Sequence, residues 1–210
     1  MIKQLIILVI SIGLFSSCGV TKRDKYNALN DYLDSVIKDS EEIMVIKEIV
    51  APDLAISMFY GNDFWPKYPD TTVVTREYGI HGLVLEKGKW LDLFDKKDWS
   101  KMKKKYGSEK KKVVGESGYW KLDDFRHKKI VFENLAVFLK NKTSIYFDTP
   151  EKKVFEFSSP IRYQKKYLVF RVTGTTTKSY WGGFIDLVVV MEKVNGKWIV
   201  RGEAGPDYVI

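Results

Sequence analysis

The residues that could form a catalytic nucleophile and its base are few in this chain. Ser117 lies in Gly115-Glu116-Ser117-Gly118, which partly matches the G-x-S-x-G turn that exposes a nucleophilic serine. That turn needs a glycine two residues after the serine, where the chain has Tyr119. A serine nucleophile also needs a histidine base, and the chain has only His81 and His127. The sequence therefore argues against nucleophilic catalysis at Ser117.

Of the two histidines, His81 is the better candidate for a base. His127 lies among three cations in Phe125-Arg126-His127-Lys128-Lys129, and their charge disfavours the imidazolium that a base must become. His81 lies in Gly79-Ile80-His81-Gly82, between glycines. We expect His81 to be a turn or surface histidine, and a hydrolase that uses His81 is kept as one alternative.

The sequence also shows no residue spacing typical of an acid–base pair, a metal cluster or a phosphate-binding loop. The acidic pairs Glu41-Glu42 and Asp123-Asp124 are adjacent, so their side chains point to different faces of a strand or about 100° apart on a helix. We expect them at a helix surface or cap. One cysteine and two histidines exclude a Cys-cluster or His-rich metal site, and no glycine-rich phosphate motif is present. We therefore predict that the protein is not an enzyme and has no catalytic residue, metal or cofactor.

A run of lysines dominates the charge of the chain. The 210 residues carry a net charge of +8, and residues 96–112 contain nine lysines against Asp98 and Glu109. Each lysine near an anionic membrane surface contributes about 1 kcal/mol of attraction. We expect a solvated helix and loop, and electrostatic contact with a membrane or a partner is kept as the functional interpretation. The lysines concerned are Lys101, Lys103, Lys104, Lys105, Lys110, Lys111 and Lys112.

Aromatic residues gather in the segment 59–68, which holds Phe59, Tyr60, Phe64, Trp65 and Tyr68. Apolar rings beside polar side chains suit contact with a sugar or a peptide, and rings can equally close one end of a small core. We expect Phe59 and Phe64 in the core. Trp65 and Tyr68 are expected on the surface, because two nearby prolines keep that segment out of a strand. A second loop of this kind holds Tyr180 and Trp181.

The first eighteen residues predict an export signal. Lys3 precedes an apolar stretch, Leu5 to Phe15, that is too short to span a bilayer and matches the hydrophobic region of a secretory signal. The following Leu14-Phe15-Ser16-Ser17-Cys18 resembles the lipobox of Bacteroidetes-type lipoproteins. The resemblance implies cleavage before Cys18, diacylation of its thiol and acylation of the new amino terminus. An acidic run after Cys18 would resemble the surface-export signals of Bacteroidetes lipoproteins, and this chain has none at that place. The resemblance therefore implies an anchor that faces the periplasm, in the outer membrane.

This interpretation divides the chain into a cleaved signal peptide (1–17), a lipidated tether (18–24) and a single α+β domain (25–210). Hydrophobic spacing predicts a first helix over 22–39 and a short helix over 98–106, with Asp95 as its cap and Gly107 at its end. Runs of β-branched and aromatic residues predict strands at 43–50, 54–60, 72–76, 83–86, 90–94, 153–157, 167–173, 184–193 and 197–202.

We expect an antiparallel sheet with the first helix packed on one face and a C-terminal hairpin. Asn195-Gly196 predicts a type I′ turn, in which both residues need φ > 0. Leu187 to Met191 is almost wholly apolar, which predicts a strand covered on both faces.

Residues 153–202 resemble a C-terminal module of uncharacterised Bacteroidetes proteins. The resemblance rests on Phe157-Ser158-Ser159-Pro160-Ile161, Tyr167-Leu168-Val169-Phe170, Gly182-Gly183 and Asn195-Gly196-Lys197-Trp198. Relatives often carry cysteines where this chain has residues 179–181, so the resemblance implies no redox or disulfide role here. It implies no activity either.

Together these features predict a lipid-anchored, non-catalytic binding or structural domain that faces the periplasm. Its expected partners are the membrane, through the lipid on Cys18, and a protein or a glycan. Nucleic acid is not expected, since proteins that bind it use arginine and interleaved aromatics and the compartment is wrong. The first alternative is an immunity-type inhibitor that blocks a delivered toxin, with its basic strip facing an acidic partner. The second alternative is the hydrolase around His81.

Overall fold

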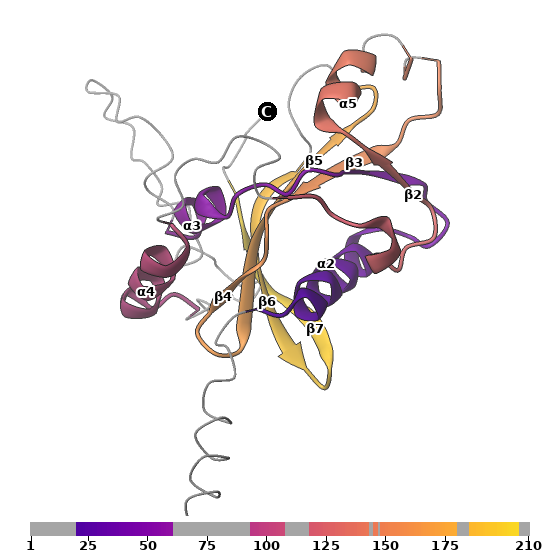
Figure 1. The fold of residues 1–210 in the computed structure, drawn as a ribbon. Coiled ribbons are helices and arrows are strands. Elements are labelled where there is room, and N and C mark those ends of the chain that lie inside the picture. The colour runs from indigo at the N-terminus through magenta and orange to yellow at the C-terminus, as the bar shows by residue number, and fades with distance from the viewer. Residues whose placement is uncertain are drawn as a thin grey trace, which may run out of the picture.

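The computed structural model describes residues 20–60, 93–107, 118–142, 145–146, 148–179 and 185–205. Figure 1 shows the elements, which follow one another along the chain with the bounds given next. They are α2 (Lys22–Val36), β1 (Ile43–Ile46), α3 (Asp53–Tyr60), α4 (Lys96–Tyr106), the 3-10 helix η2 (Leu122–Asp124), β2 (Ile130–Glu133), α5 (Leu135–Asn141), β3 (Lys153–Phe157), β4 (Ile161–Tyr163), β5 (Tyr167–Thr176), β6 (Ile185–Val194) and β7 (Lys197–Ala204).

The described strands form one seven-stranded sheet of order β2-β1-β3-β5-β6-β7, with β4 paired to β5. The predicted α+β class is confirmed, and β3 to β7 pair antiparallel as expected. The sheet is mixed, however, because β1 runs parallel to both β2 and β3. Parallel neighbours need long crossover connections, and no short turn signal announces them in the sequence.

Helix α2 covers one face of the sheet, as predicted. Thr21 caps it, since its hydroxyl oxygen accepts a hydrogen bond from the Asp24 amide at 3.0 Å. The helix ends at Val36 instead of residue 39, because the next residue, Ile37, is extended. Its buried residues pack into one cluster with strands β3, β5, β6 and β7; the helix contributes Tyr26, Ala28, Leu29, Tyr32 and Leu33.

Helices α3 and α4 lie on the opposite face (Figure 1). The strand predicted at 54–60 is wrong, because Asp53–Tyr60 is helical. Ala55, Met58 and Phe59 are spaced i, i+3, i+4 and are buried together, which is the helical period. A short apolar run satisfies both periods, so the sequence alone did not decide between them. Phe59 is in the core, as predicted.

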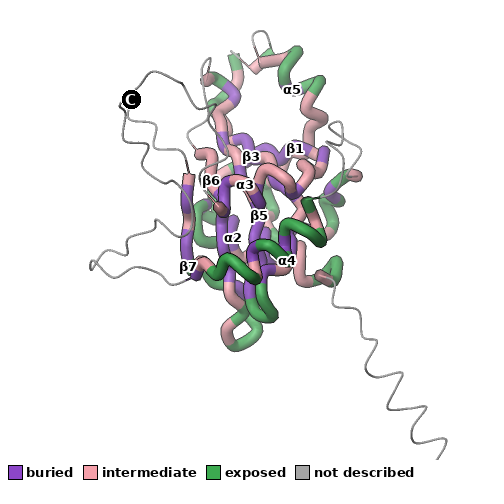
Figure 2. Tube along the Cα trace, turned by 90° about the vertical axis from the view of Figure 1, so that its left-hand side faces the viewer, coloured by how far each residue is buried: buried purple, intermediate pink, exposed green. Residues whose placement is uncertain are grey.

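The C-terminal hairpin agrees with the sequence. Asn195 and Gly196 have φ of 50° and 85°, as a type I′ turn requires. Strand β6 is covered on both faces, since Val189 and Met191 belong to the cluster under α2 while Val188 and Val190 belong to the other. Figure 2 shows buried residues concentrated along β5 and β6, whereas α4 is largely exposed.

The remaining predicted strands have mixed outcomes. The strand at 43–50 is shorter than expected, because β1 ends at Ile46 and only isolated bridges follow. The strands at 72–76 and 83–86, and residues 90–92 of another, lie outside the described residues, and Leu93 and Phe94 are not in a strand. Within the described part of the chain, none of the helices combines the length and the hydropathy needed to cross a bilayer.

Candidate functional site

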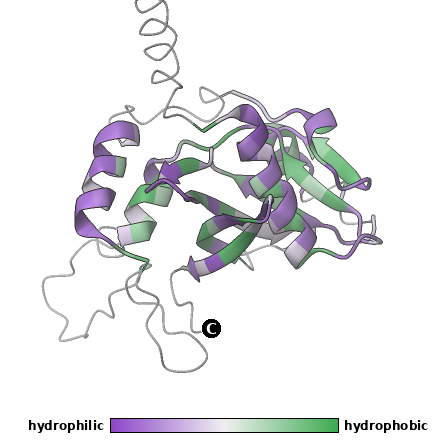
Figure 3. Cartoon of the chain, turned by 90° about the horizontal axis from the view of Figure 1, so that it is seen from below, coloured by the Kyte–Doolittle hydropathy of each residue, from purple (hydrophilic) through white to green (hydrophobic). Residues whose placement is uncertain are grey.

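Helix α4 (Lys96–Tyr106) carries the first part of the lysine run, and a specific contact fixes each of its ends. Asp95 caps it, since its carboxylate accepts a hydrogen bond from the Asp98 amide at 2.8 Å. At the other end the Gly107 amide donates to the Lys103 carbonyl oxygen at 2.7 Å. The predicted helix, cap and terminating glycine are therefore confirmed, with two more residues at the start. Trp99 and Met102 are its buried residues, and the rest of the surface is strongly hydrophilic (Figure 3).

A pocket of about 520 to 650 Å³ lies on each face of the sheet, and the two have opposite charge. The larger, about 650 Å³, lies between α4 and the β4–β5 turn, and we call it the basic pocket. It brings Lys101 and Lys105 together with cations sixty residues away in the chain. Its lining residues are Asp98, Lys101, Met102, Lys105, Tyr106, Arg162, Gln164, Lys165 and Lys166.

The basic pocket has an excess of positive charge. Asp98 is the one carboxylate among its described lining residues, and it already pairs with the Lys101 ammonium at 2.7 Å. The hydrogen bond from Lys101 to Asp98 raises the pKa of that ammonium, so it stays protonated. Lys166 lies 3.0 Å from Glu192, and its hydrogen bonds to Tyr167 and Glu192 raise its pKa as well. Lys165 has no carboxylate partner within the described residues.

The two walls of the basic pocket are held together by specific contacts. The Asp95 amide donates a hydrogen bond to the Tyr163 hydroxyl at 2.6 Å, which joins the start of α4 to β4. The Trp99 ring stacks on Tyr60 with centroids 4.5 Å apart, and its Nε1–H donates to the Ile56 carbonyl oxygen at 3.2 Å. The helix that carries the lysines is therefore fixed to α3 and the sheet.

The turn on the other wall is also specific. Gln164 has φ of 53°, and the Arg162 guanidinium donates to the Lys165 carbonyl oxygen at 2.7 Å across the turn. Arg162 also lies 3.9 Å from Asp24 at the start of α2. A guanidinium can bind a carboxylate or a phosphate through two parallel hydrogen bonds, whereas lysines act as point charges. The basic pocket is therefore suited to an anionic group.

The structure places only part of the predicted site residues. Lys101 and Lys105 line the basic pocket, whereas Lys103 lies 4.9 Å over the Trp99 ring and Lys104 is exposed. The others lie outside the described residues; they are Cys18, Trp65, Tyr68, His81, Lys110, Lys111, Lys112, Tyr180 and Trp181.

The sequence reasoning missed the second wall of the basic pocket. Arg162, Lys165 and Lys166 are basic residues beside a turn, which was a visible signal in the sequence. Three cations in five residues are common on protein surfaces, so this pattern alone does not predict a site. Their position opposite α4 depends on packing between segments distant in the chain.

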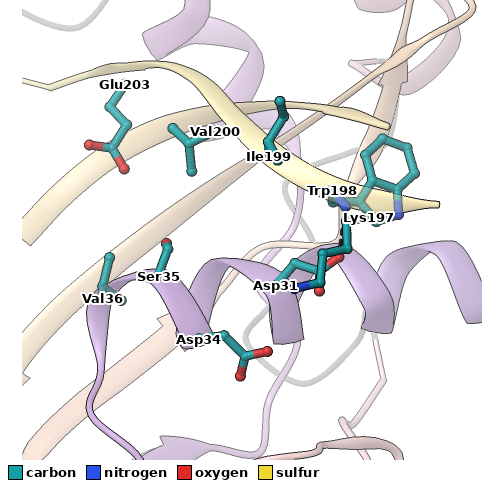
Figure 4. Close-up of a pocket in the computed structure, with 9 residues that line it drawn as sticks. All are labelled: Asp31, Asp34, Ser35, Val36, Lys197, Trp198, Ile199, Val200 and Glu203. Atoms are coloured by element: carbon teal, nitrogen blue, oxygen red, sulfur yellow. Dashed lines mark hydrogen bonds between the residues drawn. The ribbon is translucent and has the colours of Figure 1, made fainter. Parts of the chain in front are cut away.

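The smaller pocket, about 520 Å³, lies between α2 and β7 and is acidic (Figure 4). Asp31 and Asp34 both accept hydrogen bonds from the Arg126 guanidinium, at 2.5 and 2.9 Å. Asp31 also accepts a hydrogen bond from the Trp198 amide at 2.7 Å. Burial raises the pKa of Glu203, which lies farther along β7. Of the three carboxylates that line this pocket, Asp31 and Asp34 therefore hold α2 to its surroundings.

His127 and members of the two acidic pairs make contacts that hold segments of the fold together. His127 donates its Nε2–H to the Glu41 carbonyl oxygen at 2.8 Å, since a carbonyl can only accept. Glu42 pairs with Lys152 at 2.5 Å, and Asp124 pairs with Lys22 at 2.6 Å. Asp123 and Asp124 lie in the 3-10 helix η2, as expected, whereas Glu41 and Glu42 lie in the segment between α2 and β1 and not on a helix.

A half-buried polar cluster crosses β3, β5 and β6. The Arg171 guanidinium makes two hydrogen bonds to Asp186, at 2.8 and 3.0 Å. The Thr173 hydroxyl donates to the Glu156 carboxylate at 3.1 Å, and burial raises the pKa of Glu156. Among the described residues, no group of three or more His, Cys, Asp or Glu is placed to hold a metal ion.

Comparisons with protein-family models, with curated proteins and with solved structures each gave no match to this chain.

Proposed function

We propose that this chain is a lipid-anchored, non-catalytic envelope protein that acts by binding, and that the basic pocket holds an anionic group of its partner. The proposed anchor is the thioether-linked lipid on Cys18, on the periplasmic face of the outer membrane. Its support is the order of Lys3, the apolar stretch and Ser16-Ser17-Cys18 at the start of the chain.

The observation that carries the binding proposal is the convergence of two cationic segments on one pocket. Lys101 and Lys105 of α4 face Arg162, Lys165 and Lys166 of the β4–β5 turn, with Asp98 as the one lining carboxylate. Like charges brought together in this way repel one another, and an anionic ligand relieves the repulsion. A phosphate or a carboxylate has the charge and the acceptor geometry that these donors require.

The same residues support a role without catalysis. Lysines that stay protonated cannot act as general bases, and the pocket's carboxylate is occupied by Lys101. The pocket can hold and orient an anion, but its described residues offer no group that would remove a proton at neutral pH.

The test uses the mature lipidated protein in a nonionic detergent micelle, with inorganic pyrophosphate as the probe. Pyrophosphate binding is read from NMR shifts of the amides in α4 and the β4–β5 turn. We expect the double variant Lys105→Glu/Lys165→Glu to weaken binding at least about tenfold, since each reversal replaces an attraction by a repulsion. Binding in the wild type should also weaken as salt increases.

The matched control reverses Lys140, an exposed lysine of α5. Lys140→Glu makes the same change in net charge per site and should leave pyrophosphate binding within about twofold, because screening removes distant charges. Equal binding by the wild type and the double variant would contradict the proposal.

A basic pocket also suits the second candidate function, an immunity-type inhibitor, because an acidic toxin surface would be its complement. The discriminating observation is a stoichiometric complex with a purified acidic toxin. That complex should dissociate in the Lys105→Glu/Lys165→Glu variant and persist in Lys140→Glu.

A further inference from the structure

We infer that the domain docks through one end of its sheet onto anionic phospholipid headgroups of the membrane that carries its anchor. This inference rests on the proposed function and names the partner of the basic pocket. The docking end, called the basic end, consists of six exposed cations in three segments: Lys22, Arg23, Lys165, Lys166, Lys193 and Lys197.

The three segments meet in space although they are far apart in the sequence. Tyr167 pairs with Glu192, so the β4–β5 and β6–β7 turns lie side by side at one end of the sheet. The first turn of α2 joins them, because Asp24 accepts a hydrogen bond from Lys193 at 2.8 Å and lies 3.9 Å from Arg162. Figure 1 shows both turns at the lower end of the molecule. The basic pocket opens beside this end and shares Lys165 and Lys166 with it.

The basic end keeps a net positive charge after its ion pairs are counted. Three of the six cations have a carboxylate partner: Lys22 with Asp124, Lys166 with Glu192, and Lys193 with Asp24. Arg23, Lys165 and Lys197 have no carboxylate partner among the described residues. At the other end of the sheet, Lys152 pairs with Glu42 and Lys153 with Glu41. The basic end therefore keeps a net positive charge that an anionic surface can attract.

The proposed anchor emerges at the same end. Three residues lie between Cys18 and Lys22, the first residue of α2, and the four steps from Cα to Cα reach at most about 14 Å. The headgroup layer adds about 5–8 Å outside the hydrocarbon core. At physiological salt the surface potential extends about 8 Å beyond the headgroup layer. A lipid on Cys18 would therefore hold the basic end within reach of that potential.

The chemistry of the basic end favours a lipid surface over a protein partner. Five of its six cations are lysines at the start of α2, in the β4–β5 turn and in the strands beside the β6–β7 turn, where a compact, hydrated charge can approach many headgroups without fixed geometry. Stable protein interfaces centre on buried aromatic or aliphatic anchors. None of the six positions of the basic end is apolar, and exposed large apolar side chains such as Leu139 and Ile145 lie in and after α5.

The test reconstitutes the mature lipidated protein into vesicles of phosphatidylcholine alone, or of phosphatidylcholine with about one third phosphatidylglycerol. A membrane-impermeant reagent acetylates the lysines, and mass spectrometry gives the rate at each one. We expect acetylation of Lys165 and Lys197 to slow at least about fivefold in the anionic vesicles, and to recover near 0.5 M salt. Lys38 and Lys140, which lie away from the basic end, should react at equal rates in both vesicles.

A pair of variants separates this inference from the function on which it depends. Lys165→Glu/Lys197→Glu should abolish the slowing at Lys166, whereas Lys38→Glu/Lys140→Glu should keep it. Equal acetylation of the wild type in both kinds of vesicle would overturn the docking inference, as would protection that needs an added acidic protein. Pyrophosphate binding in micelles is measured independently, so its loss would overturn the proposed function instead.

Discussion

Removing the Trp99 side chain should undock α4 and abolish anion binding while the sheet survives. Trp99 is 8% exposed, stacks on Tyr60 at 4.5 Å and donates a hydrogen bond to Ile56. Truncation of a buried tryptophan to alanine costs about 3–5 kcal/mol. A domain has about 5–15 kcal/mol of stability in total. We therefore expect Trp99→Ala to fold at 25 °C but to lose the wall that holds Lys101 and Lys105.

The variant Trp99→Phe gives an intermediate step. It keeps most of the ring packing but removes the indole hydrogen bond to the Ile56 carbonyl oxygen, whose net contribution is about 0.5–1.5 kcal/mol. Its matched control is Trp120→Phe, under α2 on the other face of the sheet, where the indole Nε1 is buried with no hydrogen-bond partner among the described residues. Trp120→Phe should leave pyrophosphate binding unchanged.

Two assays separate stability from binding in these variants. Urea unfolding gives the loss of stability, and amide hydrogen exchange shows where it occurs. In Trp99→Ala the amides of α4 should lose protection, while those of β5 and β6 keep theirs. Pyrophosphate binding should fall at least about tenfold. Normal binding by Trp99→Ala, with α4 amides exposed, would refute the claim that α4 forms half of the site.

Four further predictions concern single residues. Cys18→Ser should abolish metabolic labelling by a fatty acid and firm membrane association; equal labelling of both proteins would overturn the anchor. Glu156→Gln should raise the thermal midpoint by a few degrees at pH 7, because burial raises the pKa of Glu156 and the carboxylate form is disfavoured in the folded state. The stability that protonated Glu156 contributes is present at low pH and is lost as pH rises through its folded pKa. The thermal midpoints of the wild type and of Glu156→Gln should therefore converge below about pH 4. The substitution keeps the hydrogen bond from Thr173. The purified protein should hydrolyse no ester, peptide, phosphate or glycoside substrate, and turnover that His81→Ala abolishes would establish the hydrolase instead. Trp65→Ala should leave the midpoint within a few degrees while weakening partner or glycan binding, and a large drop would show a core role.

Local signals in the sequence predicted the elements that depend on local interactions. Asp95 caps α4, Gly107 ends it, and Asn195-Gly196 makes the last turn. Each of these acts within a few residues of chain, so tertiary packing does not override it.

The elements that depend on distant partners were missed or misread. Strand β2 (Ile130–Glu133) has only four residues, all partly exposed, and its place follows from parallel pairing with β1. Helix α3 was predicted as a strand because its short, mostly apolar run fits either period, and its packing against α4 and β5 decided the outcome. For the same reason only one wall of the basic pocket was predicted: Lys101 and Lys105 stand in a conspicuous run, while Arg162, Lys165 and Lys166 join them through tertiary packing.

The position of β1 between β2 and β3 has a consequence for folding. Ile43 pairs with Ile130 on one side and with Lys153 on the other, so β1 must wait for partners at least 87 residues further along the chain. The β6–β7 hairpin, by contrast, closes between neighbours within microseconds. Such long-range contacts slow folding, since the entropy of loop closure is lost before the contacts stabilise the chain. A ribosome makes the chain from its N-terminus, so β1 is synthesised early and remains unpaired until β2 and β3 have been made. We therefore expect the nascent chain to stay largely unfolded, with its apolar first strand open to chaperones, until its C-terminal third has been made.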